Sequence, residues 1–218
     1  ADTGHSVFCL ECPGSVDYCY SKLIQGGNWT RCLKCRTGRL SAYGIGDVTT
    51  ISSQKDAVGL NEESLTKGLL SSSVTLYREE QEANYFTSER LISARRMLRQ
   101  RYIDTYQSTL NFLDQNKLDC LVVFNGRIDM TRAAIEAAQA FGITYLTHER
   151  PFMGHGIQLN VNENCLGLRS RKLLNRQFDC KPLTNKQAAL AGAEIGKRFL
   201  GTNDLEWRKY NRGSRPLP

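Results

Sequence analysis

The chain has 218 residues, of which 40% are apolar and 23% are charged, and its 29 Lys and Arg against 22 Asp and Glu give a formal charge of +7. This apolar share predicts a packed core and excludes an intrinsically disordered protein. No run of about 18 consecutive apolar residues occurs, which excludes a segment that crosses a membrane as a helix. We expect one globular domain, or slightly more than one.

The first 50 residues are rich in glycine and cysteine. A strand is predicted over Ser6–Leu10, because β-forming side chains follow a Gly-His pair that fits a turn. Six glycines lie between Leu10 and the end of the segment at Gly46, which favours loops held by something other than an apolar core. A short helix is predicted next, around Glu62–Leu70.

Five of the eight cysteines lie within the first 35 residues. Cys9 and Cys12 form one C-x2-C pair, Cys32 and Cys35 form a second, and the spacing between the pairs suits a structural zinc site. Because Cys9 falls in the predicted strand, Cys19 is the rival for its place among the four ligands. An iron–sulfur cluster also takes four thiolates, and a group of reduced thiols without metal is the remaining alternative.

The longest predicted element is an amphipathic helix over residues 88–116. Its apolar side chains recur at steps of three and four residues, as one face of a helix requires: Leu91, Ala94, Leu98, Tyr102, Tyr106, Leu110 and Leu113. A strand follows at Leu118–Phe124. Because this strand is short, β-branched and apolar, we expect both of its faces to be covered, as in parallel sheets.

A strand–helix–strand unit is predicted from Leu118 onward. The helix covers Thr131–Phe141 and ends at Gly142, and the second strand covers Ile143–Thr147. Such a unit is right-handed and places its two strands in parallel, with ligands at their carboxyl ends. A further strand is predicted over Ile157–Val161, and a capping box opens a last helix from Thr184 to Leu200.

Polar side chains follow both parallel strands at the points where they end. Because these ends meet at one edge of a sheet, we expect the two groups to share a crevice. Amide and guanidinium groups can orient a hydroxylated or anionic ligand, and an imidazole or carboxylate can take a proton from a sugar hydroxyl. The candidate bases are His148 and Glu149, and the candidate binding residues are Asn125, Gly126, Arg127, Arg150 and the loop residue His155.

These residues carry a resemblance to the bacterial glycosyltransferases of capsule and surface-polysaccharide biosynthesis, which have the GT-B architecture. The resemblance is densest over Leu121–Arg127, Thr131–Ala133, Gly142-Ile143 and Thr147–Arg150. The start of these proteins is similar to Gly4-His5 with Cys12, Cys19 and the Cys32/Cys35 pair. The segment that ends their first half is similar to Pro182–Thr184 with Gln187, Arg198 and Gly201.

The resemblance implies an α/β fold, with a Rossmann-like parallel sheet and flanking helices over residues 1–200. This domain would be the acceptor-side half of the enzyme, with a cysteine-rich insertion at residues 9–46 and a linker at residues 201–218. We expect the first strand and helix of the family, and its donor-binding half, to lie outside the sequence. The implied reactants are a nucleotide-sugar donor and a glycan acceptor. The implied location is the cytoplasm, with peripheral association with the polysaccharide machinery of the inner membrane as an option.

The competing function is that of a binding module. A zinc ribbon with a basic surface would recognise nucleic acid or another protein without catalysis. Basic residues do cluster, within residues 90–101, 169–176 and 208–215. Aromatic side chains are not interleaved with these clusters, so nucleic acid is the less favoured partner. A structural fragment without activity is the third interpretation.

Overall fold

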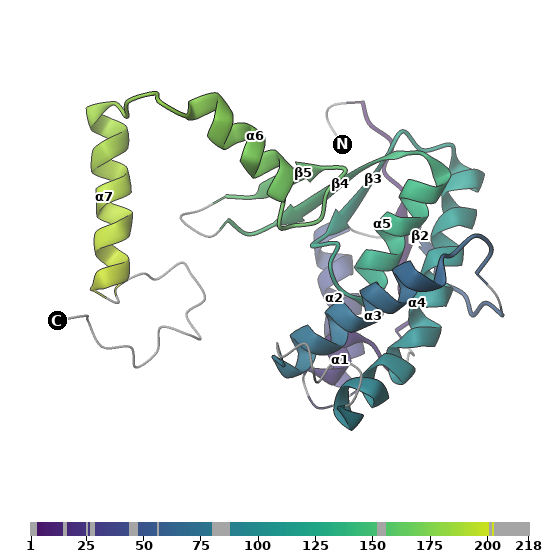
Figure 1. The fold of residues 1–218 in the computed structure, drawn as a ribbon. Coiled ribbons are helices and arrows are strands. Elements are labelled where there is room, and N and C mark those ends of the chain that lie inside the picture. Colours follow the sequence, from purple (N-terminus) through teal and green to yellow (C-terminus); the bar gives the residue numbers. More distant parts are fainter. Residues whose placement is uncertain are drawn as a thin grey trace.

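A computed structural model describes residues 4–14, 17–24, 26, 29–43, 48–55, 57–79, 88–151, 156–200 and 202, without the side chains of Tyr43 and Arg198. Over these residues the fold is mixed α/β, as the sequence predicts (Figure 1). The described elements, in chain order, are β1 (Cys9–Glu11), α1 (Tyr20–Leu23), α2 (Thr30–Tyr43), β2 (Val48–Thr50), α3 (Glu62–Tyr77), α4 (Glu89–Asn116), β3 (Cys120–Phe124), α5 (Asp129–Phe141), β4 (Thr144–Glu149), β5 (Gln158–Val161), α6 (Leu168–Phe178) and α7 (Asn185–Phe199).

Helix α4 forms the centre of the fold and packs against α3 and α5 (Figure 1). The predicted apolar stripe is confirmed, because six of its seven side chains are buried and only Leu110 is half-buried. Where the three helices meet, the buried residues are Leu65, Leu69, Leu98, Tyr102, Tyr106, Ala133 and Ala137. The 28-residue length of α4 lets one helix contact both α3 and the strand–helix–strand unit.

The strand–helix–strand prediction is also confirmed. Strands β3 and β4 pair in parallel, and α5 crosses between them and covers one face of the sheet. A second cluster of buried side chains joins α4, α5 and the two strands, and it contains Leu113, Val123, Ile135, Ala138 and Tyr145. The core therefore continues from the helices into the sheet.

The three-stranded sheet is mixed rather than wholly parallel. Its order is β3-β4-β5, and β5 pairs antiparallel with β4. Only residues 150–157 connect these two strands, and this connection is too short for a crossover, so the chain must return antiparallel.

The prediction that both faces of the Leu118–Phe124 strand are covered is wrong. Val122 and Phe124 are 62% and 49% exposed, whereas Val123 between them is 7% exposed. Alternate side chains of a strand point to opposite faces, so α5 covers the Val123 face and leaves the other open. Leu159 and Val161 of β5 are exposed as well. The strand is therefore apolar on both faces but covered on only one. An unbroken apolar run in the sequence does not distinguish a covered face from an exposed one.

The N-terminal segment contains more helix than its glycine content predicts. Strand β1 begins later than expected and pairs in parallel with β2, in a separate two-stranded sheet. Helix α2 then occupies 14 residues where loops were predicted. The glycine count was misleading because only Gly38 falls inside this helix, and the others lie before or after it.

The two C-terminal helices expose their apolar side chains. The predicted capping box is formed, since Thr184 Oγ1 accepts from the Gln187 amide at 3.3 Å and Gln187 Oε1 accepts from the Thr184 amide at 2.9 Å. In Figure 1, α7 lies away from the sheet, and its apolar residues Ile195 and Phe199 are exposed. Helix α6 was not predicted from the sequence. In the described part of the chain, no helix is long and apolar enough to cross a membrane.

The close contact between α3 and α4 predicts a sensitive position at Gly68. A Cβ atom there would lie 2.6 Å from the ring of Tyr102, which is fully buried and cannot move aside. We expect Gly68→Ala to lower the free energy of unfolding by about 1–3 kcal/mol, measured by urea denaturation.

The matched control for this substitution is Gly38→Ala in α2. A Cβ atom at Gly38 would meet nothing within 4 Å, so the usual helical preference for alanine applies. We expect an effect between zero and a gain of about 1 kcal/mol. Equal effects of the two substitutions would contradict the packing of Gly68 against Tyr102.

Candidate functional site

The carboxyl ends of β3 and β4 lie side by side, as the sequence predicts. Phe124 is in register with His148, and the Asn125 backbone amide donates to the His148 carbonyl oxygen at 2.9 Å. Strand β3 ends at Phe124 and β4 at Glu149, so His148 and Glu149 lie in the strand, whereas the predicted end at Thr147 would place them after it. The two predicted polar groups still meet at one sheet edge.

Asn125 and Glu149 are in direct contact at this edge. The side-chain amide of Asn125 donates to Glu149 Oε2 at 2.7 Å, and Asn125 Oδ1 accepts from the Arg127 backbone amide at 3.1 Å. Asn125 has a φ of 63°, a left-handed conformation that asparagine tolerates better than most residues. Its side chain therefore stabilises the turn after β3 and at the same time positions the Glu149 carboxylate.

Gly126 is the next residue of this turn, and little space is left there for a side chain. Its φ is 72°, and a Cβ atom there would lie 3.0 Å from Thr147 Cγ2 and 3.3 Å from Ile135 Cδ1. The turn after β3 is thus pressed against both the second strand and the crossover helix. This packing fixes the position of the neighbouring Asn125.

The two candidate bases point in different directions. The half-buried Glu149 carboxylate accepts from Asn125 through Oε2 and from the Arg150 backbone amide through Oε1, at 2.9 Å. His148 precedes it in β4, and consecutive side chains of a strand lie on opposite faces. The His148 ring lies against Phe124, with ring centroids 5.5 Å apart. The structure thus brings Glu149, and not the His148 ring, into contact with Asn125.

The segment after β5 also belongs to this edge, although sequence reasoning assigned it no role. The Cys165 amide donates to the Asn125 carbonyl oxygen at 2.7 Å, and the Cys165 carbonyl oxygen accepts from Gln158 Nε2 at 2.9 Å. Arg171 donates to Gln158 Oε1 at 3.2 Å. Burial raises the pKa of the Cys165 thiol, and the nearby Arg127 lowers it in part. These contacts bring Arg171 of α6 to the strand ends.

Of the remaining predicted binding residues, Arg127 is half-buried next to Cys165, and Arg150 is exposed directly after β4. His155 lies outside the described residues. The contribution of Gln158, Cys165 and Arg171 had no signal in the sequence, because it depends on the antiparallel return of β5.

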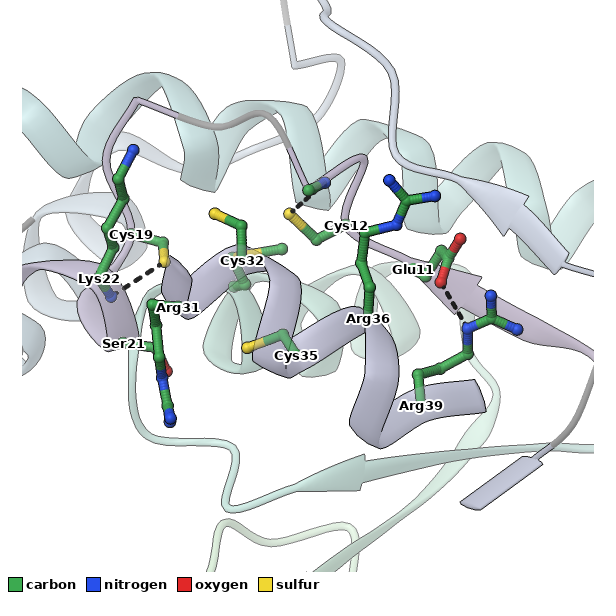
Figure 2. Close-up of a pocket in the computed structure, with 12 residues that line it drawn as sticks. Glu11, Cys12, Cys19, Ser21, Lys22, Arg31, Cys32, Cys35, Arg36 and Arg39 are labelled. Atoms are coloured by element: carbon green, nitrogen blue, oxygen red, sulfur yellow. Dashed lines mark hydrogen bonds and ion pairs between the residues drawn. The ribbon is translucent and has the colours of Figure 1, made fainter. Parts of the chain in front are cut away.

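A cavity of about 170 Å³ lies beside the cysteine-rich segment. Cys12, Cys19, Cys32 and Cys35 all line it, and Figure 2 shows the sulfur atoms of the first three turned into the same space. Cys9, the other candidate ligand, lies in β1 opposite Val48. Burial raises the pKa of the Cys12 thiol and raises that of Cys19 to about 11. Within the described ranges, no three His, Cys, Asp or Glu side chains already form a group that could hold a metal ion.

The first turn of α5 connects this cavity to the strand edge. Asp129 is buried, and its Oδ2 accepts from the Tyr20 amide at the start of α1, at 2.9 Å. The Asp129 amide donates to Ser72 Oγ of α3 at 2.7 Å, and Met130 lines the cavity. A helix that begins four residues after Asn125 therefore also anchors the cysteine-rich segment to the core.

Comparisons of the chain with protein families, with curated proteins and with solved structures found no match.

The buried Asp129 predicts a pH-dependent substitution effect. Burial raises its pKa above the ordinary value, so the folded protein binds this proton more tightly than the unfolded chain does. Ionisation of Asp129 therefore costs stability as the pH rises through its folded pKa. Asn at this position keeps an oxygen that can accept from Tyr20 and does not ionise.

We expect Asp129→Asn to be at least as stable as the wild type at pH 7, and its stability relative to the wild type to fall as the pH is lowered through the raised pKa of Asp129 to the ordinary aspartate value, below which the difference is constant. Urea denaturation at a series of pH values measures this difference. A difference that is the same at every pH would show that the Asp129 carboxyl is not perturbed by burial.

Proposed function

We propose that this chain is the acceptor-side half of a glycosyltransferase that moves a sugar from a nucleotide-activated donor to a growing bacterial capsule or surface polysaccharide. The observation that carries the proposal is the contact between Asn125 and Glu149 at the carboxyl edge of two parallel strands. Ligands of open α/β sheets bind at this edge. The glycosyltransferase resemblance is densest over the same stretch, Leu118–Arg150.

The proposed fold is one Rossmann-like half of a GT-B enzyme. Two observations support it: the parallel pairing of β3 with β4 and the crossover of α5 on one face of their sheet. The second half would bind the nucleotide sugar, as the family resemblance implies. Nucleotide sugars are used on the cytoplasmic side in this proposal, and the growing glycan brings the enzyme to the polysaccharide machinery at the inner membrane.

The proposed reaction needs one base on the acceptor side. The acceptor hydroxyl gives its proton to Glu149, and its oxygen attacks the anomeric carbon of the donor sugar. The bond between that carbon and the nucleoside diphosphate breaks, and the diphosphate leaves with the bonding electrons. Asn125 positions the Glu149 carboxylate, while Arg127 and Arg150 supply cations that can hold the acceptor or the diphosphate.

Glu149 fits the role of base better than His148 does. Its carboxylate has a fixed orientation, given by the Asn125 amide and the Arg150 backbone amide. The His148 ring lies on the open face of the sheet against Phe124, which is 49% exposed. A base must lie within hydrogen-bond reach of the proton that it removes, so the two residues cannot serve the same hydroxyl equally well.

The first test is Glu149→Gln in the full-length protein. Glutamine keeps the size and the oxygen acceptor but cannot take the proton, so we expect kcat to fall about a hundredfold or more. The measurement is nucleoside diphosphate release from a panel of uridine and guanosine diphosphate sugars, in the presence of surface-polysaccharide fragments.

Glu63→Gln is the matched control, because Glu63 is exposed on α3 and its pair with Lys67 lies away from the strand edge. Its activity should equal that of the wild type. His148→Ala tests the other candidate base. A large loss in His148→Ala together with a normal rate in Glu149→Gln would transfer the role to His148, and normal rates in both would reject the proposed site.

The second test is Asn125→Asp. Aspartate keeps the oxygen that accepts from the Arg127 amide and also tolerates a positive φ, so the turn should survive. It replaces the amide donor with a second carboxylate next to Glu149. Because like charges disfavour ionisation, the acid limb of the kcat/KM profile should move to higher pH by about one unit or more.

Asn111→Asp on the exposed face of α4 is the control for this charge change. It should leave the pH profile of kcat/KM unchanged. An acid limb at the wild-type position in Asn125→Asp would mean that the carboxylate beside residue 125 does not act in the reaction.

A further inference from the structure

The cysteine-rich segment is not held in place by buried side chains. In the described parts of residues 4–43, which include β1, α1 and α2, no side chain is fully buried. A segment with two helices and many glycines pays a large entropic cost on folding, and half-buried side chains return little of it. Small segments of this kind are usually fixed by a metal ion or by disulfides.

Four of the cysteines in this segment line one cavity. Cys12 and Cys19 come from the chain before α1, and Cys32 and Cys35 come from neighbouring positions on one face of α2. In Figure 2 the sulfur atoms of Cys12, Cys19 and Cys32 face the same space, and Cys35 follows one turn further along α2. The fold has therefore gathered thiols from three separate parts of the segment.

Two of the sulfur atoms accept backbone hydrogen bonds, which stabilise a thiolate, whereas burial favours the neutral thiol. The Gly14 amide donates to Cys12 Sγ at 3.5 Å, and the Lys22 amide donates to Cys19 Sγ at 3.4 Å. Amide donors to sulfur are a usual part of the shell around a metal-bound cysteine, because they spread its negative charge.

The positive charge around the cavity also favours a zinc centre with four thiolates. Zinc with four thiolates has a net negative charge, and the cavity is lined by Lys22, Arg31, Arg36 and Arg39. Arg39 is paired with Glu11 at 2.7 Å, whereas the buried Arg31 Nε has no hydrogen-bond partner among the residues that the structure describes. Cations around the cavity would offset the charge of such a centre.

We propose that Cys12, Cys19, Cys32 and Cys35 bind one zinc ion as four thiolates, and that Cys9 is not a ligand. Zinc displaces one proton from each thiol, and the protons pass to the solvent. The four sulfur atoms must also draw together, because the described residues do not yet present three of them as a formed metal site.

The proposed zinc site goes beyond sugar transfer and does not depend on it. The ion would fix β1, α1 and α2 to one another, and Asp129 and Met130 of α5 would connect the resulting unit to the core. Its role is therefore structural, with all four zinc positions filled by protein.

The first measurement is the metal content of the chain, purified under reducing conditions and analysed by elemental and native mass spectrometry. We expect one zinc per chain, retained by Cys9→Ser and lost by Cys19→Ser. Cys9 and Cys19 are both half-buried, so these two substitutions are a matched pair. Loss of zinc in Cys9→Ser with retention in Cys19→Ser would overturn the proposed ligand set.

Cobalt substitution tests the ligands in a way that does not depend on folding alone. A tetrahedral cobalt centre with four thiolates has intense sulfur-to-metal charge-transfer bands. We expect these bands in the wild type and in Cys9→Ser, and a weaker set in Cys35→His, because imidazole also binds cobalt and zinc. Retained metal in Cys35→His together with its loss in Cys35→Ala identifies a ligand rather than a packing residue.

Limited proteolysis tests the structural role. Removal of zinc with a chelator should make residues 17–43 at least tenfold more sensitive to cleavage, while residues 88–151 stay protected, because their core is apolar. A wild-type chain that contains no metal and gives no cobalt spectrum would overturn the proposal, and so would the presence of iron and sulfide. None of these measurements uses enzymatic activity, so their outcome is independent of the proposed glycosyl transfer.

Discussion

The parallel pairing of β3 with β4 is the constraint on which the candidate site depends. Because Phe124 is in register with His148, the next residues, Asn125 and Glu149, lie beside each other. The Asn125 side-chain amide donates to Glu149 Oε2 at 2.7 Å. A shift of one residue in this register would reverse the direction of every side chain in one strand. The buried Val123 and Tyr145 oppose such a shift, since both pack against α5 and the end of α4. The apolar core thereby sets the geometry of a polar edge.

The start of α5 links the two regions of functional interest. Asn125 lies at the strand edge, and four residues later Asp129 accepts the Tyr20 amide next to the cysteine cavity. One short stretch of backbone is thus fixed by contacts on both sides. The two regions therefore share one short stretch of backbone, although they use different chemistry.

Different forces hold the two parts of the chain. The core of α3, α4 and α5 consists of fully buried leucine, tyrosine and alanine side chains, and the hydrophobic effect accounts for its stability. The cysteine-rich segment has half-buried thiols, cations and few apolar contacts. The open face of the sheet, with Val122 and Phe124, and the exposed apolar residues of α7 show that burial is also incomplete on the other side of the core.

The sequence by itself determined the helix and strand types from Ser88 to Val161, because burial on one side of α4 and α5 repeats with the helical period and the strand segments are short and apolar. It also determined that the polar groups at the ends of these two strands meet, since parallel strands joined by a helix end at the same edge, but it left open which of His148 and Glu149 contacts Asn125. Only the tertiary structure decided that β5 returns antiparallel, that Cys165 reaches Asn125, and that Cys19 rather than Cys9 lines the cavity with Cys12, Cys32 and Cys35. Periodicity reports local burial, whereas these contacts depend on how distant segments pack, and no local pattern records that.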